Sequence, residues 1–165
     1  MADTSVADFC IRALQAADVP TLRAVLPEWV PEHWNSSGSD SAPASQHHFR
    51  VLVRRVHGGG EFGGIAEFQQ IMDEGHLLSI AIVPAFQRHG LGTKLLNAVL
   101  EELRAAGCRR CLLEVRRSNV AAQALYRQAQ FTLDGVRKEY YPALASSGSE
   151  STAQREDALL YSRPL

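Results

Sequence analysis

The chain has 165 residues, a length that suits one domain spanning residues 1–165 and that can bury about 70% of its unfolded surface without disulfides or a structural metal. Hydrophobic residues make up 45% of it and charged residues 21%, as in ordinary soluble globular proteins. The net charge of −1 excludes an overall electrostatic attraction to nucleic acid or to an anionic membrane, so we expect neither as a direct partner.

The N-terminal region and the cysteines indicate the compartment. Residues 1–19 carry three aspartates and lack both the basic region and the apolar run of a signal peptide. No stretch approaches the ~20 apolar residues that span a bilayer. Because the three cysteines have no framework spacing, we expect a reduced, cytoplasmic protein.

The N-terminal half alternates between strand-like and turn-forming segments. A first strand is predicted over residues 9–14, and Asp18 is predicted to cap a helix that has Pro20 in its first turn. Residues 27–46 are rich in Ser, Pro, Gly and Asn and predict a loop. Three further strands follow, separated by turns at 58–60 and 73–75: residues 49–56, 62–72 and 76–83. The last of these is almost wholly apolar, which is typical of a strand buried on both faces.

The C-terminal half contains the clearest helix, over residues 91–106, followed by Gly107 where a C-terminal cap is expected. Its apolar stripe consists of leucines and a valine at helical spacing: Leu95, Leu96, Val99, Leu100 and Leu103. The remaining predicted elements are a strand, a helix and a closing hairpin: residues 108–116, 119–130, 131–140 and 157–162. Residues 142–156 form a Ser-rich loop. This order predicts an α+β fold, a mixed sheet with helices on its faces.

A glycine-containing turn lies between the buried strand and the long helix, over residues 87–93. Backbone N–H groups and the helix N-terminus converge there, which suits a phosphate or pyrophosphate. The alternative is a plain strand-to-helix turn. A Rossmann fingerprint is rejected because Leu95 replaces its third glycine, and a P-loop because Thr93 precedes Lys94.

Two further residues are candidates for chemistry. Glu114 lies in an apolar strand, an odd place for a carboxylate unless it faces a cleft, where burial would raise its pKa toward that of a useful base. It can equally be a strand carboxylate paired with Arg116 or Arg117. Tyr126 has the helical spacing of a core aromatic residue, and Asn119 is placed to cap the helix that contains it.

These motifs together resemble a known family. The pattern Gln87-x-x-Gly90-x-Gly92 after Ile-Ala-Ile-Val-Pro at 80–84 resembles the acetyl-CoA motif of the GNAT superfamily of N-acetyltransferases. Leu-Glu-Val-Arg-x-Ser-Asn-x-Ala-Ala-x-x-Leu-Tyr at 113–126 resembles the RimI subgroup, as do 137–142 and 156–158. The chain departs from the family in having Gln130 where a glycine is usual, and a longer loop at 142–156.

The resemblance implies the GNAT fold, a mixed and mostly antiparallel central sheet flanked by helices on both faces. It implies acetyl-CoA as co-substrate, with Glu114 as the base and Tyr126 as the acid that protonates the leaving thiolate. The residues that it assigns to acetyl-CoA are Ile80, Ala81, Ile82, Arg88, His89, Gly90, Leu91, Gly92, Thr93 and Asn119. No metal is expected, because Cys108 and Cys111 stand three apart at a strand and point to opposite faces.

The resemblance also implies an acceptor, the N-terminal alanine of small-subunit ribosomal protein eighteen. Two other hypotheses stay open. One keeps the chemistry but replaces the acceptor with a small-molecule amine or another protein. The other is an acetyl-CoA-binding regulatory module without turnover, which the presence of both Glu114 and Tyr126 disfavours.

Overall fold

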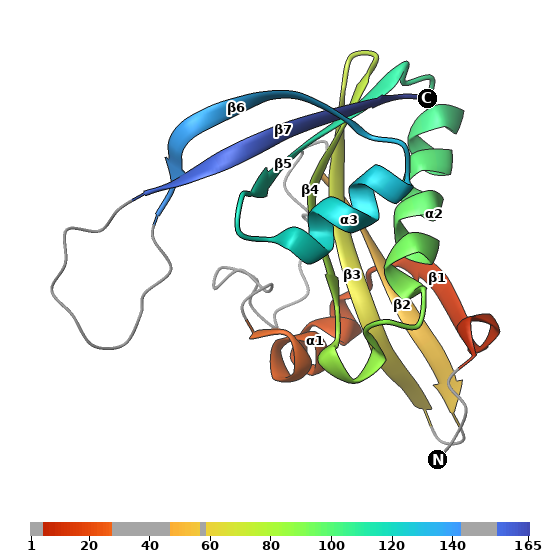
Figure 1. The fold of residues 1–165 in the computed structure, drawn as a ribbon. Helices are drawn as coiled ribbons and strands as arrows, with labels where there is room; N and C mark the ends of the chain where they lie inside the picture. The colour runs from red at the N-terminus through yellow and green to blue at the C-terminus, as the bar shows by residue number, and fades with distance from the viewer. Residues whose placement is uncertain (1–4, 28–46, 57–58, 143–154) are drawn as a thin grey trace, which may run out of the picture.

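A twisted sheet of seven strands forms the centre of the computed structural model, which describes residues 5–27, 47–56, 59–142 and 155–165 (Figure 1). The strands are β1 (Phe9–Ala13), β2 (His47–Val56), β3 (Gly59–Ile71), β4 (Glu74–Ile82), β5 (Arg110–Arg116), β6 (Thr132–Tyr141) and β7 (Glu156–Pro164). They lie in the order β1-β2-β3-β4-β5-β7-β6, and only β4 and β5 run parallel. The predicted mixed, mostly antiparallel sheet is therefore confirmed.

Helices cover both faces of this sheet. The helices are α1 (Val19–Val25), α2 (Leu91–Ala105) and α3 (Val120–Gln128), with short 3-10 turns at η1 (Val6–Asp8), η2 (Ala16–Asp18) and η4 (Pro84–Phe86). On one face Leu22 of α1 packs with Val51 and Ile65. On the other face the apolar stripe of α2 and Tyr126 of α3 pack with Leu113 of β5. The two core layers place α1 opposite α2 and α3, as the GNAT fold requires.

The predicted apolar stripe of α2 is buried along its whole length, with no residue of the stripe more than 2% exposed. Its periodicity of three and four residues keeps one side of the helix against the sheet. The helix ends at Ala105, and Gly107 has a left-handed backbone (φ 86) that lets the chain turn into β5. The sequence thus predicted both the buried face and the end of this helix.

One strand differs from its prediction. We expected residues 76–83 to be buried on both faces, but only alternate residues of β4, such as Leu77 and Ala81, are buried. Leu78 is 42% exposed, and Ile80 and Ile82 are partly buried. The reason is that β4 loses its neighbour β5 after Leu77, so on that edge its second half has no strand partner among the described residues.

Asp18 also differs from its prediction. It stands at the N-cap position of α1, but its carboxylate does not cap that helix. Instead it accepts two hydrogen bonds from Arg12, at 2.6 and 2.8 Å, and one from the N–H of Gln15 at 2.8 Å. A two-pronged guanidinium–carboxylate contact pairs two opposite charges, whereas a cap would bind the carboxylate only to an uncharged backbone N–H. Burial opposes the ionised form, but these three bonds outweigh it and lower the pKa of Asp18.

Two of the predicted loops, 27–46 and 142–156, fall mainly on residues 28–46 and 143–154, which lie outside the described residues. Residues 57–58 also lie outside them, whereas Gly59 and Gly60 of the predicted turn at 58–60 begin β3. Within the described ranges, no helix combines the length and the apolar character needed to cross a membrane. The predicted hairpin of β6 and β7 is confirmed, and β6 forms one edge of the sheet.

Candidate active site

The parallel strands β4 and β5 separate at the middle of the sheet. Their pairing begins at Glu74 and Arg110 and stops at Leu77 and Leu113. At the same level β4 contains a bulge, because its register with β3 shifts and leaves Leu78 as an additional residue. Beyond this point the edge of β4 that would face β5 has no strand partner among the described residues. The divergence opens a cleft in the sheet.

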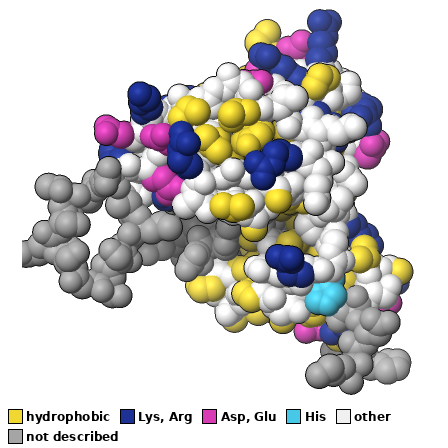
Figure 2. Space-filling view, in the orientation of Figure 1, with side chains coloured by type: hydrophobic (Ala, Val, Ile, Leu, Met, Phe, Trp, Pro, Cys, Tyr) yellow, Lys and Arg dark blue, Asp and Glu magenta, His cyan; other side chains and the backbone are white. Residues whose placement is uncertain are grey.

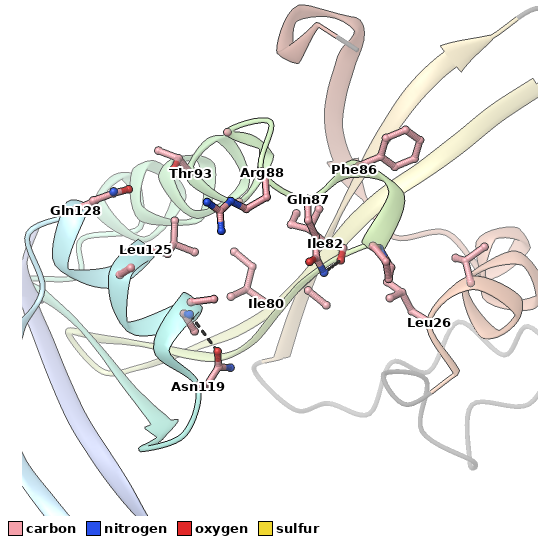
Figure 3. A pocket seen from close by; sticks show the side chains of 18 of the residues that line it. Leu26, Ile80, Ile82, Phe86, Gln87, Arg88, Thr93, Asn119, Leu125 and Gln128 are labelled. Atoms are coloured by element: carbon pink, nitrogen blue, oxygen red, sulfur yellow. Dashed lines mark hydrogen bonds between the residues drawn. The ribbon is translucent and has the colours of Figure 1, made fainter. Parts of the chain in front are cut away.

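The cleft has a volume of about 740 Å³ and is bounded by β4, the turn before α2, and α3, with the end of α1 at its far side. Figure 3 shows Arg88, Leu125 and Ile80 pointing from these three elements toward the same space. Its walls include most of the residues that the resemblance assigned to acetyl-CoA: Ile80, Ala81, Ile82, Arg88, Gly90, Gly92, Thr93 and Asn119. The structure thus brings these separate sequence positions together.

The turn at the cleft entrance has the geometry of an anion site. Arg88 (φ 66) and Gly90 (φ 78) both adopt left-handed backbones, and Gly90 is the N-cap residue of α2. The side-chain amide of Gln87 donates a hydrogen bond from Nε2 to the backbone carbonyl of Ile82 at 3.0 Å, which connects the turn to β4. The first N–H groups of a helix have no acceptor within it, and they carry the positive end of its dipole. Arg88 adds a full positive charge beside them.

Gly92 keeps this space open. A methyl group added there would lie 3.5 Å from Leu125 and 3.8 Å from Ile82, an ordinary packing distance. The glycine is therefore not needed to avoid a clash within the protein itself. A side chain at this position would instead fill the cleft between α2, α3 and β4. An open floor, a helix N-terminus and apolar walls fit a pyrophosphate with an extended apolar arm.

Two of the residues assigned to the cofactor are not part of the cleft wall. Leu91 is 1% exposed and packs in the core with Phe9 and Phe86, so only its backbone N–H is placed to face an anion. His89 is exposed and does not line the cleft. Asn119 lines it and also accepts a hydrogen bond from the N–H of Ala122 at 3.1 Å, so its predicted cap is confirmed.

Sequence reasoning did not assign Leu125 and Gln128 of α3 to this site, although both line it. Leu125 appeared to belong only to the apolar side of α3. The signal that was available is the run of alanines at 121, 122 and 124, because small side chains let a ligand approach a helix closely.

Glu114 is the first residue of β5 beyond its last pair with β4. Its side chain is 32% exposed and its Oε1 lies 3.0 Å from Nη1 of Arg137, which comes from β6. Arg116 and Arg117, the partners considered from the sequence, bind acidic residues of β7 instead. Glu114 thus stands where the strands divide, in an ion pair that the sequence did not predict.

Tyr126 lies in the core and does not line the cleft. It is 5% exposed, and its ring packs against Phe131 and Tyr161 with centroids 5.8 and 6.5 Å apart. Burial is the main cause that raises the pKa of Tyr126, and the neighbouring Tyr141 and Cys111 raise it further. The phenol therefore holds its proton at neutral pH.

Tyr141, at the end of β6, lies near both Glu114 and Tyr126. Burial raises the pKa of its hydroxyl, and the nearby Glu114 and Tyr140 raise it further, against the opposing charges of Arg116 and Arg137. The guanidinium of Arg116 lies 4.4 Å from the centre of the Tyr141 ring. Acidic and basic side chains stand next to one another where this hairpin leaves the sheet (Figure 2). The signal in the sequence was the pair of tyrosines before Pro142.

The described residues contain no group of three or more His, Cys, Asp or Glu side chains that could hold a metal ion. Cys108 and Cys111 are both buried. Burial is the main cause that raises the pKa of the Cys111 thiol to about 12, so it is not a thiolate at neutral pH.

Comparison with known proteins agrees with this geometry. The Acetyltransferase (GNAT) family model matches residues 14–131. The chain is 33% identical over 155 residues to the [ribosomal protein bS18]-alanine N-acetyltransferase of Escherichia coli (strain K12), covering 94% of this chain and 97% of that relative. It is also 31% identical over 170 residues to the N-alpha-acetyltransferase of Saccharolobus solfataricus, covering 96% and 94%.

A solved structure is similar over the same extent. The crystal structure of the ribosomal-protein-S18-alanine N-acetyltransferase from Escherichia coli has a TM-score of 0.71 and 31% sequence identity, and the match covers 94% of this chain and 93% of that one. Enzymes of the matched family use acetyl-CoA, and the cleft offers the anion site and apolar walls that this co-substrate needs. The chain belongs to the GNAT family of acetyltransferases.

Proposed function

We propose that this enzyme transfers the acetyl group of acetyl-CoA to the α-amino group of a protein N-terminus, the N-terminal alanine of ribosomal protein bS18. The observation that carries the proposal is the cleft that lies between the turn before α2 and β4 as far as Ile80, close to where β4 and β5 divide beside Glu114. Relatives that match nearly the whole chain and bear the name of that activity support the acceptor.

The residues of the cleft would hold acetyl-CoA in a defined direction. The first N–H groups of α2 and the guanidinium of Arg88 would bind the pyrophosphate. The free edge of β4 at Ile80 and Ala81 would bind the amide groups of the pantetheine arm, as a strand binds an added strand. An arm bound in this direction would bring the thioester toward the place where β4 and β5 divide.

Glu114 and Tyr126 would move the protons of the reaction. Glu114 removes a proton from the acceptor ammonium group, directly or through a water molecule, and the neutral nitrogen attacks the thioester carbonyl carbon. The carbon–sulfur bond breaks, and the sulfur takes a proton from the hydroxyl of Tyr126. The second proton, which the nitrogen loses as the amide forms, restores this hydroxyl. A phenol carries this proton at neutral pH, since its ordinary pKa is about 10.

An α-amino group suits this machinery better than a lysine side chain does. Its ordinary pKa is about 7.7–8.0, whereas that of lysine is about 10.4, so a single carboxylate removes its proton more readily. The tyrosines at the end of β6, Tyr140 and Tyr141, pack edge to face with ring centres 5.1 Å apart. They would form one wall of the acceptor site beside Glu114, where a small first residue fits most easily.

A thiol-release assay tests the proposal against its alternatives. With acetyl-CoA and a peptide that begins with alanine, we expect CoA release that depends on the peptide and drops in Glu114→Gln. Release with small amines alone would favour the small-molecule acceptor, and binding of acetyl-CoA without any release would favour the regulatory module. Organisation as one domain and a cytoplasmic location stay predictions.

A further inference from the structure

Arg137 is bound to the proposed base in a way that the proposed reaction does not use. Its Nη1 lies 3.0 Å from Oε1 of Glu114, and its guanidinium lies over the ring of Tyr140 at 4.6 Å from the centre. The arginine side chain is 48% exposed and the glutamate 32%, so the pair faces solvent rather than the core. A positive group thus occupies the position at Glu114 that an acceptor ammonium needs.

The backbone that carries Arg137 lies at the edge of the sheet, where Arg137 pairs with Ala158 of β7. β6 is the outer strand, and its pairing with β7 is interrupted between Arg137 and Tyr141. Within this interruption Glu139 has a left-handed backbone (φ 51), and its N–H is bound to the side chain of Asp157 at 3.0 Å. The Arg137 side chain is therefore able to leave Glu114 without breaking the ladder of the sheet.

The neighbouring cations are held elsewhere. Arg116 binds Glu156 at 3.2 Å and the carbonyl of Pro142 at 2.9 Å, and Arg117 binds Asp157 at 3.0 Å. Among the described residues, the ion pair of Glu114 is with Arg137 alone. This side chain is thus the one that competes with an incoming amine.

We propose that Arg137 is a specificity-determining residue, which covers Glu114 until an acceptor amine displaces it and so prevents the enzyme from hydrolysing acetyl-CoA. The inference rests on the proposed role of Glu114. In the side reaction, the oxygen of a water molecule would attack the thioester carbon and its proton would pass to Glu114. The carbon–sulfur bond would break, and acetate and CoA would be released. The guanidinium beside Oε1 of Glu114 keeps a water molecule away from this oxygen, whereas an ammonium group competes with the guanidinium by charge.

The test is the release of acetate and CoA from acetyl-CoA in the absence of any acceptor. For Arg137→Gln we expect a rise of about tenfold or more, a part of the 10²–10⁴-fold that a positioned base supplies. Arg137→Met, which retains the aliphatic stem over Tyr140, should show the same rise. Arg137→Lys, which retains a cation, and Arg117→Gln, which removes a neighbouring one, should stay close to the original enzyme.

Two results would overturn the inference. The first is unchanged hydrolysis in both Arg137→Gln and Arg137→Met, with melting curves that show a folded protein. The second is a rise that persists in the double variant Glu114→Gln/Arg137→Gln, because the proton would then not pass to Glu114. Amine transfer by Glu114→Gln separates this failure from that of the proposed function. If transfer is lost there while Arg137→Gln leaves hydrolysis unchanged, only the role of Arg137 is refuted.

Discussion

The hydroxyl group of Tyr126 is the proposed proton donor, although its ring belongs to the core. The apolar surroundings that pack the ring also raise the pKa of the phenol, so the group stays protonated well above neutral pH. A protonated phenol is what a departing thiolate requires. Whether the hydroxyl contributes to turnover is separable from packing, because one substitution removes the oxygen and keeps the ring.

Tyr126→Phe should reduce kcat by about 10²–10⁴-fold, because no other group is proposed to protonate the leaving sulfur. The affinity for acetyl-CoA should stay nearly unchanged, since the substitution keeps the ring and the hydroxyl is proposed to act on the sulfur only as it departs. Steady-state kinetics and calorimetric titration give the two values. Tyr161→Phe, at a second buried tyrosine, is the matched control. A decrease below about threefold for Tyr126→Phe would return this residue to a purely structural role.

At the scale of the elements, the beginning of α2 and the end of α3 show how backbone geometry serves the site. The beginning of α2 depends on glycine at position 92. A methyl group added there would clash with nothing in the protein, so the role of the glycine is to keep the cleft open. Just after the end of α3, Gln130 adopts a left-handed conformation (φ 63). There the N–H groups of Gln130 and Phe131 bind the carbonyls of Arg127 and Tyr126, both at 3.0 Å, which closes the helix in a Schellman arrangement.

Gly92→Val should weaken acetyl-CoA binding by at least about tenfold, or about 1.4 kcal/mol, because its branches would occupy the cleft beside Leu125. Calorimetry measures the affinity, and thermal melting checks the fold. Asn97→Val, at an exposed position of the same helix, controls for the effect of a branched residue in α2. A folded Gly92→Val protein with unchanged affinity would remove the cofactor from this turn.

Gln130→Gly should stabilise the protein by about 0.5–1 kcal/mol, because a left-handed backbone is strained for any residue with a Cβ. For a protein of this size, that corresponds to about 1–4 °C in Tm. Gln128→Gly, the same change at the last residue of α3, should instead lower stability by about 1 kcal/mol. Scanning calorimetry distinguishes the two. Destabilisation by Gln130→Gly would mean that the glutamine side chain contributes more than the strain costs.

The sequence predicted the elements better than it predicted their surroundings. The stripe of α2 and the glycine after it were readable because helical periodicity is local. The exposure of Leu78 could not be predicted from the sequence, since an apolar run has the same pattern whether it faces another strand or a cleft. The ion pair of Glu114 with Arg137 could not be predicted either. It depends on the register of β5 and β6 with β7, which lies between them. Charges adjacent in sequence suggested the wrong partners.

At the scale of the whole molecule, the order of the strands creates the site. Because β5 joins β4 only over their first residues and β7 lies between β5 and β6, the sheet divides into two parts that diverge beside Glu114. A period of two residues indicates which face a side chain occupies, but not which strand is its neighbour. The family motifs indicated the turn that we propose binds acetyl-CoA, whereas the division of the sheet became visible only in the structure.

The central claim is that the acceptor is a protein N-terminus. The most direct measurement is mass spectrometry of two peptides of one sequence after incubation with enzyme and acetyl-CoA. One peptide has a free N-terminal alanine and no lysine, and the other has a blocked terminus and a single internal lysine. We expect the first to gain an acetyl group and the second to remain unmodified over the same time. Equal or faster acetylation of the lysine peptide would contradict N-terminal specificity, while leaving membership of the GNAT family intact.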